Sequence, residues 1–202
     1  MVKVVALVVM RFIERGKLPV LLSTSFELSS FGFFQKGSVK EVATFVAREV
    51  VQRSERGELE SVKHREYVCH CQIFQNNLAI CVLSDEEYPQ RVAFSLIQQA
   101  SDLFQRQYEA SKWNTAEKDQ ALPVTGMDAL LLKYQDPSEA DKILKIKKDL
   151  EETKTIVYKS IEQMLERGDR LEDLAAKSND LSFQSKAFMK QAEKMNSCCV
   201  IL

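Results

Sequence analysis

The sequence lacks the features that several large classes of protein require. Its longest uninterrupted apolar run, at residues 4–10, is far shorter than the roughly 18 to 20 residues that cross a bilayer. Positive and negative side chains nearly cancel, with 28 Lys and Arg against 29 Asp and Glu, so no chain-wide field attracts nucleic acid. We therefore expect neither a membrane-spanning helix nor binding to a phosphate backbone.

Groups that commonly perform catalysis are also scarce. The only histidines, His64 and His70, stand beside no recognisable nucleophile motif. The stretch 16–18 lacks the upstream glycine and the following Ser or Thr of a phosphate-binding loop. Cys69 and Cys71 alternate with His70, so a strand would place them on the opposite face from it. We expect no enzymatic activity, no catalytic residues, no metal site and no cofactor.

A length of 202 residues suits one domain with an appendage. Apolar and β-branched residues predict strands over 2–12, 18–26, 58–63, 67–74 and 78–84, and helical spacing predicts helices over 38–53 and from residue 89 to about 104. Periodicity then fades, and Pro123 and Gly126 appear. The sequence predicts an α+β domain over 1–126 and a linker over 127–137.

The remaining residues have a different pattern. Pro137 suits the first turn of a helix, and no proline follows it. From residue 143 to residue 195, mostly apolar side chains recur alternately every three and four residues, which is the spacing of a coiled-coil seam. The large apolar positions are Ile143, Ile146, Leu150, Val157, Met164, Leu171, Leu174, Leu181, Phe188 and Met195. We expect residues 138–197 to form one long helix or a segment able to become one.

The centre of this seam is a charged residue, Arg167. A self-paired zipper would set two such charges face to face, and an unpaired buried guanidinium is strongly destabilising. Partner helices that bring acceptors such as glutamine carbonyls would solve this problem. Gly168 beside it costs a helix about 1 kcal/mol relative to alanine. The seam therefore favours foreign helices over self-association.

The stretch 165–174, Leu-Glu-Arg-Gly-Asp-Arg-Leu-Glu-Asp-Leu, resembles the centre of an R-SNARE motif. The resemblance implies that Arg167 is the zero-layer residue, opposed by three glutamines from Qa, Qb and Qc SNARE helices, and that the apolar seam positions are layers of the four-helix bundle. It also implies membrane fusion in vesicle-mediated transport, with the SNARE disassembly machinery as a further partner.

Residues 199–202, Cys-Val-Ile-Leu, follow the pattern of a prenylation site, with Cys199 as the acceptor. One lipid gives only marginal membrane binding, so a second lipid on Cys198 would make attachment stable. Leucine at the last position favours geranylgeranyl. We expect a prenyltransferase to modify the tail, residues 198–202. We also expect the attached lipids to bind membranes.

The whole chain resembles the Ykt-type prenylated R-SNAREs, synaptobrevin relatives that have a longin domain and no transmembrane segment. The stretches 29–35, 87–94, 134–137 and 185–188 carry this resemblance, together with the tail. It implies a longin (profilin-like) domain whose five-stranded antiparallel sheet lies between helices. It also implies farnesyl on Cys199, palmitoyl or a second prenyl group on Cys198, and residence in the cytosol and on the cytoplasmic face of Golgi, vesicle, endosomal or vacuolar membranes.

A free lipid and an unassembled seam would expose more apolar surface than a soluble protein normally leaves uncovered. On the helix predicted at 38–53, Phe45 points away from the apolar stripe. The resemblance implies a groove on the longin domain, which we place at Phe45, Val42 and Val46, that holds the segment and lipid in a closed, autoinhibited monomer. The alternative is a longin-domain trafficking adaptor with a structural coiled coil that drives no fusion.

Overall fold

One mixed sheet organises the chain. The structure is a computed structural model that describes residues 4–138 and 155–197, without the side chains of 192–197. The strands are β1 (Val4–Arg11), β2 (Val20–Phe26), β3 (Leu59–His64), β4 (Tyr67–Ile73), β5 (Leu78–Asp85) and β6 (Ile156–Ser160). Their order is β2-β1-β5-β4-β3-β6. The first five pair antiparallel, and β6 adds parallel to β3.

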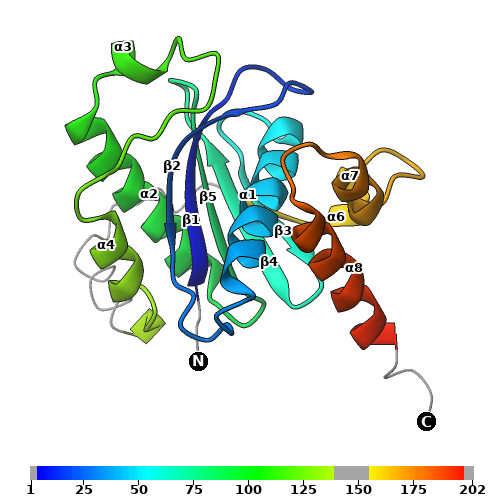
Figure 1. Ribbon diagram of the computed structural model, residues 1–202. Helices are drawn as coiled ribbons and strands as arrows, with labels where there is room; N and C mark the ends of the chain where they lie inside the picture. The colour runs from blue at the N-terminus through cyan, green and yellow to red at the C-terminus, as the bar shows by residue number, and fades with distance from the viewer. Residues whose placement is uncertain (1–3, 139–154, 198–202) are drawn as a thin grey trace.

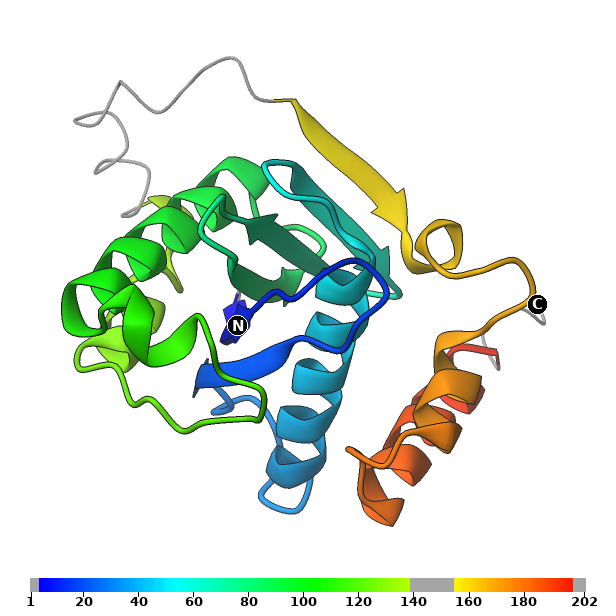
Figure 2. The ribbon, with the colours of Figure 1, turned by 90° about the horizontal axis from the view of Figure 1, so that it is seen from above.

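Helices cover both faces of the sheet (Figures 1 and 2). Helix α1 (Lys36–Arg53) lies on one face, and α2 (Gln90–Gln107) lies on the other with α4 (Met127–Lys133); α3 (Ala110–Trp113) follows α2. Because strand residues alternate, β1 supplies Leu7 and Val9 to the core under α2 and Val8 and Met10 to the core under α1. The five longin-type strands and the two long helices confirm the α+β prediction, and the sixth strand comes from the C-terminal part of the chain.

The predicted linker over 127–137 carries more structure than the sequence indicates. Helix α4 lies within this range, and Met127, Leu131 and Tyr134 are buried in the core under α2. The Tyr88 hydroxyl donates a hydrogen bond of 2.7 Å to the carbonyl of Tyr134. The packed body therefore extends to about Tyr134, and we use "the body" below for residues 4–134.

The sequence predicts one long helix over 138–197 or a segment able to become one, and the described residues of this range do not form a single long helix. Its described residues form β6 and then α6 (Ile161–Met164), α7 (Leu171–Lys177) and α8 (Phe183–Ser197). We call residues 155–197 the C-terminal segment. It runs along the edge of the sheet and beside α1 (Figures 1 and 2). Without partner helices, several of its apolar side chains are buried against the body.

Two local features interrupt helical geometry in the segment. The Ser160 side chain caps α6 in a capping box with Gln163, so a new helix starts where β6 ends. Gly168, in the turn between α6 and α7, has a φ of +99°, in the left-handed region that side chains avoid. The glycine next to Arg167 therefore permits the turn seen here.

Candidate functional site

The C-terminal segment and the body share one hydrophobic core. From the segment, the buried apolar side chains in this core are Ile161, Leu165, Leu171, Ala175, Leu181 and Met189. They join Phe45, Val46 and Val50 of α1 and the adjoining face of the sheet. Burying one large aliphatic side chain contributes roughly 1.5 to 3 kcal/mol, so this shared core is the main attraction between segment and body.

The predicted seam residues that the structure describes face this core to different degrees. Leu171 and Leu181 are buried in it, while Met164 and Leu174 are half-buried against it. Phe188 packs beside a neighbouring cluster of Val5, Leu28 and Val39, and Val157 is half-buried on β6. Ile143, Ile146, Leu150, Cys198, Cys199 and the side chain of Met195 lie outside the described residues. The face expected to meet foreign helices is thus turned largely toward the body.

Arg167 lies elsewhere. It is exposed in the turn between α6 and α7, directly before Gly168. Of the described seam residues that follow it, Leu171 and Leu181 are buried and Leu174 and Phe188 are half-buried, whereas the arginine itself is accessible to solvent.

The three residues expected to form a groove, Phe45, Val42 and Val46, all lie where the segment meets α1. Phe45 is only 4% exposed and lines a small cavity of about 180 Å³ together with Leu174 and Asp180 of the segment. Val42 and Val46 line a larger cavity on the other side of α1. Phe45 turns away from the sheet because a second apolar layer, the segment, covers that side of the helix.

The larger cavity measures about 300 Å³ and is mainly apolar. Its walls come from β1, from the turn before α1 and α1 itself, from strands β3 to β5 and from Phe188 and Met189 of α8. His64, Arg65 and Glu66 lie among its lining residues, and burial together with the nearby Arg65 charge lowers the pKa of His64. An apolar cavity of this size with a polar side is large enough to accept a hydrocarbon chain.

Strand β6 covers what would otherwise be the free edge of the sheet. Residues Leu59 to Lys63 of β3 pair in parallel with Ile156 to Ser160 of β6. The Lys159 ammonium lies 2.7 Å from the carboxylate of Glu60, whose side chain is almost completely buried and also accepts a hydrogen bond from Ser54. A charge buried this deeply needs a partner, and the segment provides one.

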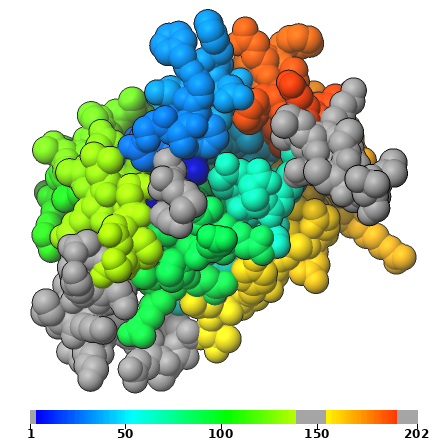
Figure 3. All heavy atoms as spheres, turned by 90° about the horizontal axis from the view of Figure 1, so that it is seen from below, coloured from blue at the N-terminus to red at the C-terminus, as the bar shows by residue number. Residues whose placement is uncertain are grey.

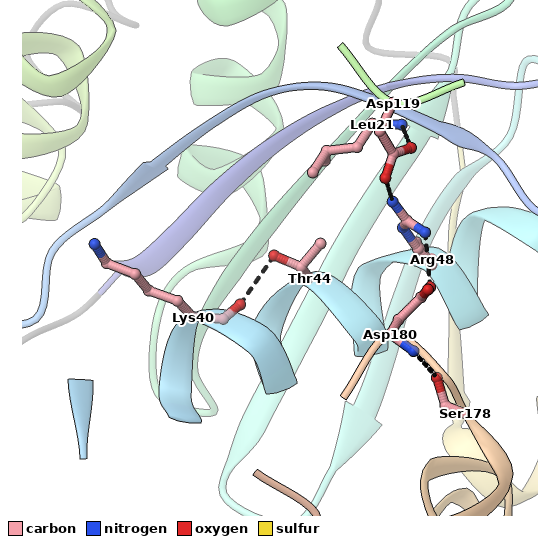
Figure 4. Close-up of polar contacts among 7 residues, drawn as sticks. All are labelled: Leu21, Lys40, Thr44, Arg48, Asp119, Ser178 and Asp180. Carbon is pink, nitrogen blue, oxygen red and sulfur yellow. Dashed lines mark hydrogen bonds and ion pairs between the residues drawn. The ribbon is translucent and has the colours of Figure 1, made fainter. Parts of the chain in front are cut away.

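A buried guanidinium links the segment to a second part of the body (Figure 4). Arg48 of α1 is 5% exposed, and its Nη1 donates to the Asp180 carboxylate at 2.7 Å, while its Nη2 donates to Asp119. Asp119 also accepts the Leu21 backbone N–H at 2.9 Å. Because Asp119 and Asp180 are about half exposed, each ion pair is partly screened by water.

Two further polar contacts hold the segment at other points. Arg65, in the β3–β4 turn, lies 2.7 Å from Glu172 of α7. Glu41 of α1 accepts the backbone N–H of Ser182 at 2.8 Å, immediately before α8 begins. Hydrogen bonds from Ser182 and Ser185 lower the pKa of Glu41, since they stabilise its charged form. These contacts anchor α7 and the start of α8.

Sequence reasoning did not identify Arg48, Arg65 or Glu60 as parts of this interface. Arg48 follows Phe45 by three residues, so the two share one side of α1. An arginine beside an aromatic residue on the outer side of a helix was the available signal. Nothing comparable marks Arg65 or Glu60, because their partners are distant in the sequence.

The buried histidine of β4 is held by hydrogen bonds within the core. His70 points to the face opposite Cys69 and Cys71, as expected, and its ring nitrogens lie 2.9 and 3.1 Å from the hydroxyls of Ser61 and Ser84. Burial lowers the pKa of His70 to about 4, so it is neutral at physiological pH. Within the described residues, no group of three or more His, Cys, Asp or Glu side chains is placed to hold a metal ion.

Comparison with known protein families agrees with this two-part architecture. A longin family model, described as a Regulated-SNARE-like domain, matches residues 28–124, and a synaptobrevin model matches residues 142–201. The chain thus combines a longin domain with a synaptobrevin-type SNARE segment. In the described residues, no helix is long and apolar enough to cross a membrane.

Full-length relatives narrow the assignment. The YKT6 synaptobrevin homologue of Dictyostelium discoideum is 51% identical over 186 residues, which cover 91% of this chain and 92% of the relative. The VAMP-like protein YKT61 of Arabidopsis thaliana is 44% identical and covers 99% and 100%, and the Schizosaccharomyces pombe homologue ykt6 is 40% identical and covers 90% and 91%. The chain belongs to the Ykt6-type synaptobrevin homologues, longin R-SNAREs of vesicle trafficking, and proteins of this family are not enzymes.

The two aspartates around Arg48 allow a matched test of the closed arrangement. Asp180→Asn removes a charge that holds the segment, so we expect about 1 kcal/mol less attraction and roughly fivefold faster proteolysis within residues 170–190. Asp119→Asn removes the equivalent charge from a contact that lies wholly within the body. In limited proteolysis, the segment should therefore be cleaved faster in Asp180→Asn than in Asp119→Asn. Equal cleavage rates in the segment would contradict a role for Asp180 in holding it to the body.

Proposed function

We propose that this R-SNARE drives membrane fusion by adding residues 138–197 as one helix to a four-helix bundle with Qa, Qb and Qc SNAREs, and that its longin domain holds the segment closed beforehand. In the bundle, Arg167 donates hydrogen bonds to three glutamine carbonyls at the central layer. One observation supports the closed state most directly: Leu171 and Leu181, two predicted layer residues, are buried against the longin domain.

The closed and fusion-active states would exclude each other. A side chain such as Leu171 cannot lie both in the core under α1 and in a bundle of foreign helices. Q-SNARE helices that bind only the open segment would draw the population toward it, by as much as their affinity for that state allows. Because Arg167 is exposed in the closed form, it does not have to leave a buried position before the bundle forms.

We further propose that the closed form shelters a lipid. Cys199 carries farnesyl or geranylgeranyl, and Cys198 carries palmitoyl or a second prenyl group. The apolar cavity of about 300 Å³ can hold one such chain, and Phe188 and Met189 of α8 form part of its wall. Opening the segment removes this wall, so the SNARE face and the lipid would be released together.

This coupling assigns a place and a partner to each state. The closed monomer resides in the cytosol after a prenyltransferase has modified it. The open form is attached by lipid to the cytoplasmic face of Golgi, vesicle, endosomal or vacuolar membranes. After fusion, the SNARE disassembly machinery returns the chain to the pool that can close again.

Arg167→Ala tests the central layer. The substitution would leave three glutamines without their donor, so we expect at least tenfold weaker assembly with Qa, Qb and Qc SNAREs in a heat-resistant complex. The thermal stability of the free protein should not change, because Arg167 is exposed in the closed form. Lys190→Ala, an exposed position outside the seam, serves as the control. If the unsubstituted chain formed no four-helix complex with these SNAREs, the result would favour the alternative function, a longin-domain trafficking adaptor.

Gly168→Ala should favour the open segment by two effects. Alanine at a φ of +99° strains the closed turn, and alanine stabilises the helix of the bundle. Together these effects amount to about 2 kcal/mol, or roughly a 30-fold shift toward the open form. Hydrogen exchange in α7 and α8 would measure this shift.

Gly16→Ala is the matched control for this substitution. Gly16 also has a positive φ, of +85°, and open space around its Cα, but it lies between β1 and β2. It should lower overall stability without selectively exposing the segment. Equal exposure of α7 in both variants would contradict a role for Gly168 in the opening step.

Cys199→Ser tests the lipid anchor. Without the acceptor thiol no prenyl group can be added, so the variant should be recovered entirely in the soluble fraction of cells. Fractionation with a Cys198→Ser variant beside it separates the two sites, since loss of the second lipid alone should leave reversible attachment. Membrane residence of Cys199→Ser equal to that of the unsubstituted chain would contradict the assignment.

A further inference from the structure

Two adjacent aromatic rings project into solvent in the turn before α1. Phe33 is 83% exposed and Phe34 is 94% exposed, and their rings pack edge to face with centroids 5.5 Å apart. Isolated apolar side chains are common on protein surfaces, but a contiguous pair of large rings usually marks a contact surface. Neither the closed segment nor the core of the longin domain covers them.

The turn that presents these rings is already ordered. The Gln35 backbone N–H donates to the Gly32 carbonyl at 2.9 Å, and the Gln35 side chain accepts the Gly32 N–H at 3.2 Å. The preceding Phe31 is half-buried against the cluster of Leu28 and Val39, which fixes the turn to the body. Little backbone entropy remains to be lost when this turn binds a surface, so even a small contact can contribute measurable affinity.

The charges around the rings suit a lipid surface. Residues 28–40 contain Lys36 and Lys40 and no acidic residue. Rings next to lysines are typical of segments that insert into the headgroup region of a bilayer. Glu27 and Glu41 flank this range and offset the two lysines, and Glu27 lies close enough to Lys36 for their charges to interact. We therefore expect apolar insertion to dominate and anionic lipid to add a modest preference.

The position of the turn in the fold also fits a membrane contact. The β2–α1 turn lies at the end of the molecule toward which α8 descends (Figure 1), and Figure 3 looks onto this end. Helix α8 ends at Ser197, and Cys198 and Cys199 follow it directly in the sequence. In the closed form, the turn and the C-terminal end of α8 therefore lie at the same end of the molecule (Figure 1).

We propose that Phe33 and Phe34 form a second, protein-borne membrane contact that inserts into the interfacial region of a phospholipid bilayer. The contact needs no lipid on Cys199 and no SNARE partner, so it stands independently of the proposed function. Two weak contacts on one molecule reinforce each other through their effective concentration. The ring pair would orient the longin domain and prolong visits that a single prenyl group makes brief.

The test uses the full-length chain with Cys198→Ser and Cys199→Ser, so that no lipid is attached. Phe34→Trp adds a reporter at the turn, while the native Trp113 is fully buried and gives a constant background. On titration with phosphatidylcholine vesicles, the emission of the reporter should shift to the blue. Vesicles that also contain phosphatidylserine should bind a fewfold more tightly because of Lys36 and Lys40.

Vesicle flotation of the same unlipidated chain supplies the matched comparison. Phe33→Ser with Phe34→Ser should reduce binding about tenfold. Phe183→Ser removes a ring that is 86% exposed but lies on α8 and not in this turn. It should change binding less than twofold. Circular dichroism would confirm that both variants are folded, which is expected because the substituted rings lie outside the core.

Three results would overturn the proposal. One is the absence of a blue shift with either vesicle composition. Another is equal loss of flotation for the double variant and for Phe183→Ser, which would indicate a general effect of apolar surface. The third is a reporter emission that is already blue-shifted without vesicles in the lipidated chain and does not change when vesicles are added to that chain. That result would show that the ring pair covers the protein's own lipid.

Discussion

The closed structure depends on burial of one apolar surface, the hydrophobic face of the C-terminal segment. The C-terminal segment carries Leu171, Leu181 and Met189 on a face too apolar to remain in water, and it is too short of internal contacts to bury them alone. In the present structure α1 and the sheet cover this face. In a SNARE bundle three other helices would do so. The same side chains would thus stabilise either state, and under the proposed function the longin domain inhibits because it and the partner helices compete to cover them.

Polar contacts determine where the apolar face of the segment packs on the body. The hydrophobic effect is non-directional, but β6 pairs with β3 in a defined register, and Arg48, Glu60 and Arg65 each meet a charged group of the segment. Individually, contacts that are partly exposed are weak. A closed state built in this way can have a fixed geometry and yet be only modestly stable, as the proposed reversible inhibition requires.

The sequence predicted the elements whose burial pattern is local. The strands and both long helices follow from apolar periodicity, and Gly16 marks a turn that has a positive φ. Strand β6 could not be anticipated, because Ile156–Ser160 satisfies the 3.5-residue seam and reads equally well as helix. Likewise, α4 is short, and the partners of Arg48 lie 71 and 132 residues away. Such long-range pairings are decided by tertiary packing, and the two states proposed for the segment explain why one pattern can encode two structures.

The longin domain and the partner SNARE helices are proposed to compete for the apolar face of the segment. Hydrogen exchange of the full chain, with and without Qa, Qb and Qc SNAREs, measures this competition most directly. In the free protein, the amides shared between β3 and β6 should be protected together. After assembly, the account predicts that residues 156–197 become more strongly protected while β3 loses protection at its uncovered edge. Assembly that left the β3–β6 protection unchanged would contradict the claim that the longin domain and the partner helices compete for the same face.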